Sequence, residues 1–599
     1  MEMILERSQV KKEDKWDVDS IYPELSLWEQ DAKTAGKLIE KLADMKTVFL
    51  NSASNFKDMV LLDDKTSRLI EKLYVFAHLK SNEDMRNATY QELIGKASQL
   101  YQDYEEKTAY VQPMMLKEEP SKILGFIDQE KELETYRHNI EDLLRYKDHT
   151  LTEEQEKILA AFSRTLSAGS DAASFLMDAD MRFGNIINEN GEEVELTDSN
   201  YSIYLKSFDR KVRKQAFERM QETYGSYKNT LTATLASVVN AASVSARLNH
   251  FSSSLQASLY ANKIPEALYT NLIESVHRYL PLLYDYFAIK KDLLQVDEFH
   301  LYDGYVSTVP SIDKQYDFET GKQLVQEALS ILGDEYSQVL KSAFVDGWID
   351  KYPNRGKSGG AYSSGCYDTK PYVLLNYTNT YDDVSTLAHE LGHSMHSYFS
   401  IQYNDYANHS YPLFLAEIAS TVNELLFSYY MEQQATDPKE KMAILNERLD
   451  MFKGTIFRQT MFAEFEKHMH DLTDQKEILT ADSLSKYYYE LNKLYFGKDV
   501  VVDEAISYEW LRIPHFYRPF YVYQYATGLS IAAYIAKNIL EETPGFKDKY
   551  IEFLKSGGRD YPLEVLKIID VDLTTAKVFD EAMDMFRDTL GTFKKLNQK

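Results

Sequence analysis

The sequence has a single cysteine, Cys366, in 599 residues. One cysteine cannot form a disulfide within the chain, and this favours a reducing compartment. Proline and glycine are also scarce, at 14 and 23 residues, which is typical of a mainly helical protein. No apolar run reaches the roughly 18 residues of a membrane span, and the N-terminus lacks the apolar core of a signal peptide. We therefore expect a cytoplasmic protein with no membrane partner.

Basic residues are also few relative to acidic residues. The chain has 67 Lys and Arg against 94 Asp and Glu, so its formal net charge is −27. Binding to nucleic acid or to an anionic membrane surface needs clustered Lys and Arg. Nucleic acid is therefore excluded as the partner. The hydrophobic fraction of 44% is sufficient for a large core, so the chain is expected to fold.

Most of the sequence shows the apolar spacing of amphipathic helices, for example over residues 67–80, 91–112 and 209–247. One interruption, residues 183–197, predicts a β-hairpin, because Asn190-Gly191 suits a tight turn between alternating residues. We predict an N-terminal helical region, residues 1–200, that ends in this hairpin. A larger helical region, residues 201–599, follows it.

A second interruption precedes the most informative motif. Residues 354–366 form a glycine- and serine-rich loop, and residues 371–378 predict a strand. We expect loop residues 356–365 to be flexible and to contact a substrate, and the strand to pair with a bound peptide. A helix is predicted from residue 381, with Asp382 or Asp383 as its N-cap.

That helix carries the motif H-E-L-G-H at residues 389–393. His389 and His393 are four residues apart and face one side of a helix, so both can bind one zinc ion. Glu390 points about 100° away round the helix, where it can act as a general base on a water molecule. Gly392 leaves space for another element to approach closely. His396 is interpreted as a packing or hydrogen-bonded residue and not as a ligand.

A third ligand is needed to complete a catalytic zinc site. One class of zinc proteases uses a histidine six residues after the second, but here that residue is Phe399. The apolar run at residues 413–430 contains Glu417 and Glu424 on one face of a predicted helix. Burial of an unpaired acid is costly, and zinc would remove that cost for Glu417. Glu424 could accept a hydrogen bond from a ligand histidine.

A third cluster lies in residues 510–529, W-L-R-I-P-H-F-Y-R-P-F-Y-V-Y-Q-Y-A-T-G-L. A helix is predicted to begin near Phe520, and it would place Tyr521 and Tyr525 on the same face. His515 lies just before them. Neutral donors of this kind can stabilise the oxyanion of a tetrahedral intermediate, although many of the 45 tyrosines must be half-buried structural residues.

These motifs, together with F-L-A-E-I-A-S-T at 414–421 and G-K-S-G-G-A-Y-S-S-G at 356–365, resemble the oligoendopeptidase F branch of the thimet oligopeptidase family of zinc metallopeptidases. The resemblance spans nearly the whole chain. It implies a mainly α, two-lobed fold with a deep substrate channel, a small β element near the active site, and short unfolded peptides as substrates.

The resemblance also implies roles for individual residues. The zinc ligands would be His389, His393 and Glu417, with Glu390 as the catalytic base and Glu424 as a supporting acid. Contacts to the substrate or the transition state would come from a second set of residues: His515, Tyr521 and Tyr525. Relatives of the thimet type place a further tyrosine where this sequence has Gly528, so the identity of the tyrosine that donates to the oxyanion stays open.

We therefore predict a zinc-dependent oligoendopeptidase with one Zn²⁺ per chain and a water in the fourth coordination position. Zinc would lower the pKa of this water toward ~7, and Glu390 would transfer its proton to the leaving amine. One alternative is a carboxypeptidase or aminopeptidase with the same site. Another is a non-catalytic peptide binder stabilised by zinc, which the presence of Glu390 disfavours. The oligomeric state is not predicted.

Overall fold

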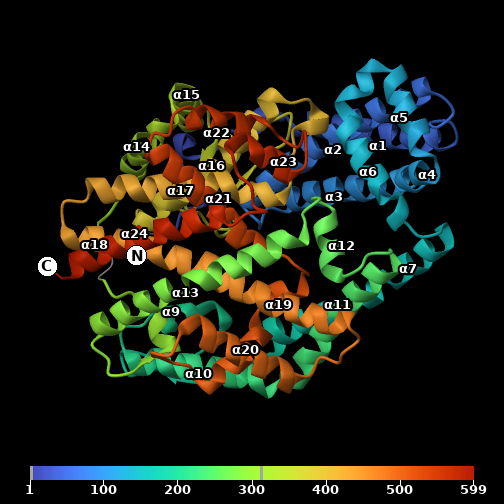
Figure 1. Cartoon of the computed structure of the whole chain (residues 1–599). Coiled ribbons are helices and arrows are strands. Elements are labelled where there is room, and N and C mark those ends of the chain that lie inside the picture. Colours follow the sequence, from blue (N-terminus) through green and yellow to red (C-terminus); the bar gives the residue numbers. More distant parts are fainter. Residues whose placement is uncertain (1–3, 310–313, 599) are drawn as a thin grey trace. The chain divides into compact units, whose positions relative to one another are not determined.

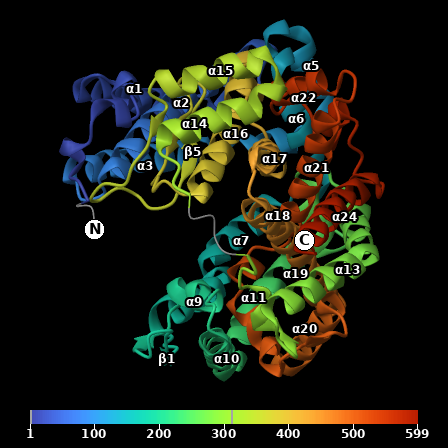
Figure 2. The ribbon, with the colours of Figure 1, turned by 90° about the vertical axis from the view of Figure 1, so that its left-hand side faces the viewer.

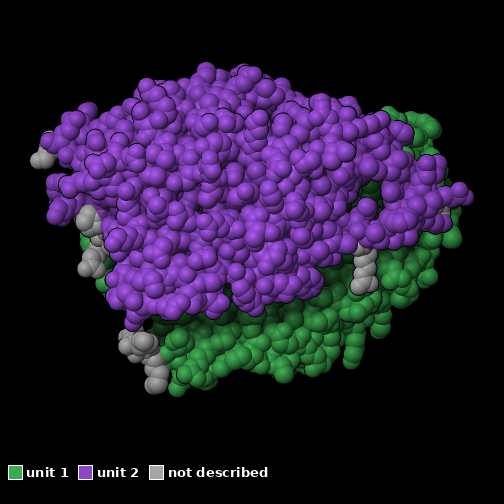
Figure 3. Space-filling model, turned by 90° about the horizontal axis from the view of Figure 1, so that it is seen from below, with its two compact units in different colours: residues 1–150, 313–431, 535–570 green, residues 151–312, 432–534, 571–599 purple. Residues whose placement is uncertain are grey.

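The computed structural model describes residues 4–309 and 314–598. It has 73% helix and 3% strand, which confirms the predicted mainly α fold with small β elements (Figure 1). The chain forms two compact units, coloured separately in Figure 3. Unit 1 comprises residues 1–150, 313–431 and 535–570, and unit 2 comprises residues 151–312, 432–534 and 571–599. The boundary predicted at residue 200 separates two successive regions of the chain, whereas each compact unit is built from three separate segments. That boundary stays a prediction.

Unit 1 is built mainly from helices of the N-terminal region and of the segment that contains the histidine motif. Its helices are α1 (Leu25–Asp44), α2 (Ala53–Glu83), α3 (Ala88–Thr108), α4 (Val111–Lys117), α5 (Pro120–Gln129), α6 (Arg137–Leu144), α14 (Phe318–Leu329), α15 (Asp334–Val345), α16 (Tyr381–Tyr403), most of α17 (Leu413–Gln434), the end of α21 (Tyr523–Leu540), α22 (Phe546–Lys555) and α23 (Pro562–Leu566).

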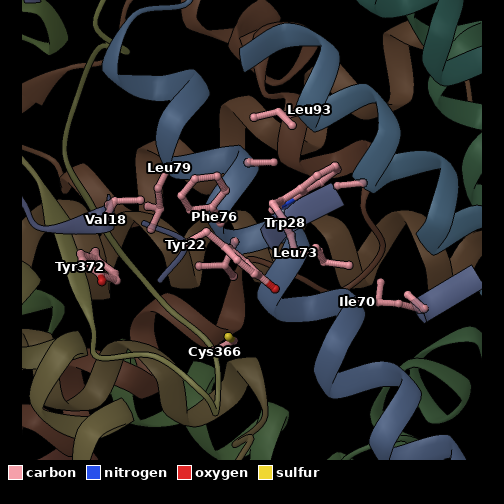
Figure 4. Packing of buried hydrophobic residues seen from close by; sticks show 14 of the residues in the cluster. Val18, Tyr22, Trp28, Ile70, Leu73, Phe76, Leu79, Leu93, Cys366 and Tyr372 are labelled. Carbon is pink, nitrogen blue, oxygen red and sulfur yellow. The ribbon is translucent and has the colours of Figure 1, made fainter. Parts of the chain in front are cut away.

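One hydrophobic core of unit 1 lies between α1, α2 and α3, which pack side by side (Figures 1 and 2). Trp28 is fully buried at its centre, and its indole N–H donates to the carbonyl oxygen of Leu73 at 3.1 Å. Phe76 packs there as well, and Tyr372 and Cys366 join from the segment before the histidine helix (Figure 4). This core thus anchors the residues that lead into the candidate site.

A small sheet precedes the histidine helix. The strands β4 (Ile349–Asp350), β5 (Tyr362–Ser364) and β6 (Tyr372–Leu374) are arranged in the order β4-β6-β5. The predicted strand at 371–378 is confirmed in its first part. Part of the predicted flexible loop is instead the strand β5, which is antiparallel to β6. The loop before β5 is held by Lys357, whose buried ammonium group lies 2.7 Å from the carboxylate of Asp350.

The histidine helix α16 begins where a capping box satisfies its first backbone N–H groups. The Thr380 hydroxyl accepts from the backbone N–H of Asp383 at 3.1 Å, and the Asp383 carboxylate accepts from the backbone N–H of Thr380 at 2.9 Å. The predicted N-cap, Asp382 or Asp383, is therefore wrong by two or three residues. Asp383 occupies the third helical position, where its negative charge also favours the helix N-terminus.

Unit 2 contains the hairpin and a separate group of packed helices. Its helices are α7 (Glu153–Leu166), α8 (Ala168–Ser174), α9 (Asp198–Leu205), α10 (Arg210–Ser226), α11 (Lys228–Leu248), α12 (Ser254–Tyr260), α13 (Glu266–Leu294), α18 (Pro438–Phe452), α19 (Arg458–Asp474), α20 (Ala481–Phe496), α24 (Lys577–Asn597) and the start of α21. Helix α19 contacts α11, α13 and α20, and α20 also contacts α11 and α13 (Figure 2).

The predicted hairpin is confirmed as the antiparallel strands β1 (Asn185–Ile187) and β2 (Glu193–Glu195). Gly191 in its turn has a φ of 79°, which a residue with a side chain adopts at a cost. A second pair of strands in unit 2, β3 (Phe299–His300) and β7 (Val500–Val501), is parallel.

Candidate metal centre and active site

Two histidines of α16 lie on one face of the helix. His389 and His393 are one turn apart, and their ring centroids are separated by 5.0 Å. Helix α17 brings Glu417 to them, with its Oε2 atom 3.6 Å from Nε2 of His389 and 3.4 Å from Nε2 of His393. One ligand atom from each of the three residues lies within 4.8 Å of the other two. The structure therefore brings the three predicted ligands together.

The donor set of this cluster fits zinc. Two imidazole nitrogens and one carboxylate oxygen are the protein donors of catalytic His₂Glu sites, which keep a further position for water. The hydrogen bond with His393 lowers the pKa of Glu417 to about 2, and burial opposes this shift only in part. Glu417 is therefore ionised at neutral pH, as a carboxylate ligand must be.

The close crossing of α16 and α17 depends on Gly392. A Cβ atom at this position would lie 2.5 Å from Cα of Ser420 and 2.6 Å from the carbonyl oxygen of Ala419. Both are backbone atoms, so no side-chain rotation could relieve the overlap. The space that the sequence predicts beside Gly392 is thus filled by the backbone of α17, one turn after Glu417.

A buried amide joins the two helices next to the crossing. The side-chain nitrogen of Asn423 donates to the carbonyl oxygen of Ala388 at 3.0 Å, and its oxygen accepts from the hydroxyl of Tyr336 at 2.9 Å. Asn423 is fully buried. Sequence reasoning did not identify it, although a single amide in an apolar helical run is a signal that could have done so.

Glu424 contacts one of the predicted ligands. Its Oε2 atom lies 3.2 Å from Nδ1 of His389. A carboxylate only accepts, so Nδ1–H donates, and this tautomer leaves the lone pair on Nε2, which faces Glu417. Burial lowers the pKa of His389, but the Glu424 hydrogen bond and the nearby negative charges outweigh burial and raise it overall.

Replacement of Glu424 by Ala should weaken zinc binding, because the orientation of His389 and the basicity of its Nε2 atom would no longer be supported. We expect the zinc dissociation constant of Glu424→Ala to rise about 10–100-fold. Glu424→Gln is the matched control, since its amide oxygen can still accept from Nδ1–H. Competition titration with a fluorescent zinc chelator measures both, and equal affinity of Glu424→Ala and the unmodified protein would contradict this role.

Glu390 lies beside the three-residue cluster in the wall of a cavity of about 590 Å³. Its exposure is 8%, and burial raises its pKa, which the two neighbouring histidines lower only in part. A backbone hydrogen bond from Ser363 also reaches it, so the outer edge of β5 lies next to this carboxylate. The cavity is lined by residues of one unit, among them Tyr362, Ser363, His389, Glu390, His393, Ser397, Tyr411 and Glu417.

β5 is joined to α16 by side chains as well. The Ser363 hydroxyl lies 2.8 Å from the hydroxyl of Ser394, which in turn donates to the carbonyl oxygen of Glu390 at 3.0 Å. Ser394 is fully buried. This pair is not predictable from the sequence, because no short-range pattern indicates which loop residue contacts the helix.

Two other titratable residues near the cavity have structural surroundings. The His396 ring stacks on Tyr411 with centroids 3.7 Å apart, and burial lowers the pKa of His396 to about 3. It is therefore a neutral packing residue, in line with the prediction. Burial likewise raises the pKa of the Cys366 thiol to about 11, so Cys366 does not form the thiolate that a nucleophile requires.

The remaining predicted residues form an aromatic cluster in unit 2. The His515 ring lies 6.0 Å from the ring of Tyr521 and 5.9 Å from that of Tyr525, and the two tyrosine rings are 5.5 Å apart. Burial, with Arg518 nearby, lowers the pKa of His515, so this imidazole is neutral at pH 7. The helix predicted from Phe520 begins instead at Tyr523, because Phe520 has a positive φ of 55°.

Comparison with known proteins decides the family. The model of peptidase family M3 matches residues 203–585, and an oligopeptidase F model matches residues 115–183. The chain belongs to peptidase family M3. Oligopeptidase PepF of Bacillus subtilis is 40% identical over 99% of this chain and 89% of its own length. The chromosomal oligoendopeptidase F of Lactococcus lactis subsp. cremoris is 37% identical over 100% of this chain and 99% of its own length.

Solved structures agree with this membership in the M3 family. A protein of Chlamydophila abortus described as a peptidase has a TM-score of 0.94 at 36% identity, over 99% of this chain and 100% of its own. Oligoendopeptidase-F of Enterococcus faecium has a TM-score of 0.75 at 34% identity, over 96% and 99% of the two chains. The M3 protein is thus a metalloendopeptidase, and peptides are its substrate class.

The residues described here also bear on the membrane prediction. Within residues 4–309 and 314–598, no helix of this M3 peptidase combines the length and the apolar character needed to cross a bilayer.

Proposed function

We propose that this M3 peptidase is a zinc-dependent oligoendopeptidase that hydrolyses internal bonds of short, unstructured peptides. One zinc ion per chain would be held by His389, His393 and Glu417. The supporting observation is the convergence of these donors with Glu390 in the wall of one cavity. Zinc bound there supplies a Lewis acid, which polarises the scissile carbonyl and lowers the pKa of water toward ~7.

Glu390 is the general base of the proposed reaction. Its carboxylate takes a proton from the attacking water as the C–O bond forms, and it delivers that proton to the amine nitrogen as the C–N bond breaks. Its position follows from the helix, since it directly follows His389 and points about 100° away from the ligand face. The backbone hydrogen bond from Ser363 holds the carboxylate in place.

The substrate backbone would pair with the outer edge of β5. Within the described residues, β5 has one partner strand, β6, so the backbone groups on its other edge that Glu390 does not engage can pair with a peptide in extended conformation. That edge lies next to Glu390 through Ser363. An extended peptide bound in this way would therefore present its backbone to Glu390. Because the pairing uses backbone groups, it would not depend on the identity of each side chain.

His515, Tyr521 and Tyr525 are proposed to contact the substrate and to stabilise the negatively charged oxygen of the transition state. A neutral imidazole and neutral phenols can each donate a hydrogen bond to such an oxyanion. The mutual ring contacts of the three residues and the lowered pKa of His515 support this role.

The proposal is tested with peptides blocked at both ends. Treatment with a chelator should abolish hydrolysis, and stoichiometric Zn²⁺ should restore it. Mass spectrometry of the products should show cuts at internal bonds. No cleavage of blocked peptides, together with cleavage of the same peptides carrying a free terminus, would instead support an exopeptidase. Hydrolysis that survives complete removal of the metal would contradict the zinc mechanism.

A further inference from the structure

The segment that carries Tyr521 bends at Phe520. The φ of Phe520 is 55°, in the left-handed region where the Cβ atom of a residue crowds its own backbone. A residue keeps such a conformation only where its surroundings hold it. Since Phe520 directly precedes Tyr521, the contacts of Phe520 determine the direction in which Tyr521 leaves the bend.

A buried acid of α19 makes the polar contact to this bend. Glu466 is 0% exposed, and its Oε1 atom accepts from the backbone N–H of Phe520 at 2.7 Å. Burial raises the pKa of Glu466 well above its ordinary value, and the hydrogen bond from the Phe520 N–H opposes this only in part. Burial thus favours the protonated form of Glu466, and the contact to the bend is the hydrogen bond that its Oε1 atom accepts.

Two aromatic residues hold the Phe520 ring itself. His470, one turn after Glu466 on α19, lies 4.4 Å from it between ring centroids. Tyr269 of α13 lies 5.9 Å away at 83°, and its hydroxyl donates to the carbonyl oxygen of Ala463 at 2.8 Å. The bend is thus fixed to α19 through both its backbone and its side chain.

We propose that Glu466 is a positioning residue for peptide hydrolysis: it fixes the bend at Phe520 and thereby orients Tyr521 toward the transition state. This inference rests on the proposed role of Tyr521. Without an acceptor at residue 466, the buried N–H of Phe520 loses its partner, and the strained bend becomes free to relax. Tyr521 would then leave the position that it shares with His515 and Tyr525.

The chain offers matched variants for a kinetic test. Glu466→Gln keeps an oxygen that accepts from the Phe520 N–H, whereas Glu466→Met has a similar length and only a weak thioether acceptor. Thr460→Val is the control on the same helix, because Thr460 is also 0% exposed and its hydroxyl has no hydrogen bond within the described residues.

Steady-state hydrolysis of an internally quenched peptide blocked at both ends gives kcat and KM. We expect Glu466→Met to lower kcat about 10-fold or more with KM within about 2-fold, and Glu466→Gln and Thr460→Val to stay close to the unmodified enzyme. In a Tyr521→Phe background, Glu466→Met should cause no further loss. A loss that is additive in that background, or equal in the Gln and Met variants, would overturn the inference.

Fluorine NMR of 3-fluorotyrosine at residue 521 gives a readout that does not depend on turnover. Glu466→Met should shift or broaden the resonance, whereas Thr460→Val should leave it unchanged. An unchanged resonance in Glu466→Met would overturn the positioning role itself. If Glu466→Met shifts the resonance but Tyr521→Phe keeps full activity, the proposed catalytic role of Tyr521 is overturned instead. The two failures are therefore distinguishable.

Discussion

A Glu390→Gln variant is expected to bind one zinc ion per chain and to lose about 10²–10⁴-fold in kcat, because the amide cannot take a proton from water. The substitution keeps the shape of the side chain and the acceptor for the Ser363 backbone hydrogen bond. The fold and the metal ligands should therefore be retained. Stopped-flow or steady-state assays with blocked peptides measure kcat, and mass spectrometry of the native protein measures zinc content.

Glu417→Gln is the matched comparison for this variant. It makes the same chemical change on a predicted ligand, so it should lower zinc affinity and activity together. Glu390→Gln should lower activity without lowering zinc affinity. Full turnover by Glu390→Gln at normal zinc content would remove Glu390 from the reaction, while a parallel loss of zinc would make it a ligand or a structural residue.

A Gly392→Ala variant is expected to disrupt the metal centre from a position that makes no contact with the metal. The new methyl group would overlap with backbone atoms of Ser420 and Ala419, at 2.5 and 2.6 Å. Helix α17 would have to move away from α16, at a cost of about 1–3 kcal/mol in stability. Glu417 and Asn423 would move with it. We expect zinc affinity to fall at least about 100-fold, since one of three ligands would be displaced.

Gly95→Ala is the control for Gly392→Ala. Gly95 lies within α3, and a Cβ atom there would meet nothing within 4 Å. An alanine in a helix loses less conformational entropy on folding than a glycine, so Gly95→Ala should be neutral or stabilising by about 0.5–1 kcal/mol. Thermal unfolding and zinc competition titrations compare the two variants. Normal zinc binding by Gly392→Ala would show that the helices can separate without loss of the site.

The proposed metal ligands could be predicted from the sequence because their arrangement is largely local. His389 and His393 share a face through helix periodicity alone. Glu417 follows from a longer-range argument, the cost of burying an acid in an apolar helix. Its side chain is 48% exposed, so that premise is wrong, although the residue does lie beside the two histidines. Gly392 predicts only that some other element approaches α16 closely. The structure brings these residues together as expected, and it also places Glu424 against His389.

Other features depend on tertiary contacts that carry no local pattern. The strand β5 lies in a glycine- and serine-rich segment with weak strand propensity, and it forms because β6 and Ser394 supply partners. The bend at Phe520 is held by Glu466, which lies 54 residues earlier in the chain. At the start of α16, the prediction considered only Asp382 and Asp383 and missed Thr380, because cap propensity alone does not show which of these residues precedes the first helical turn.

We propose that one zinc ion is held jointly by two imidazoles of α16 and a carboxylate of α17. Diffraction data collected on both sides of the zinc absorption edge can locate this ion. We expect one anomalous peak per chain, within bonding distance of His389, His393 and Glu417, with Glu390 beside it but not bonded to it. A peak bonded to other residues, or a zinc-loaded and active protein in which Glu417 points into solvent, would contradict it.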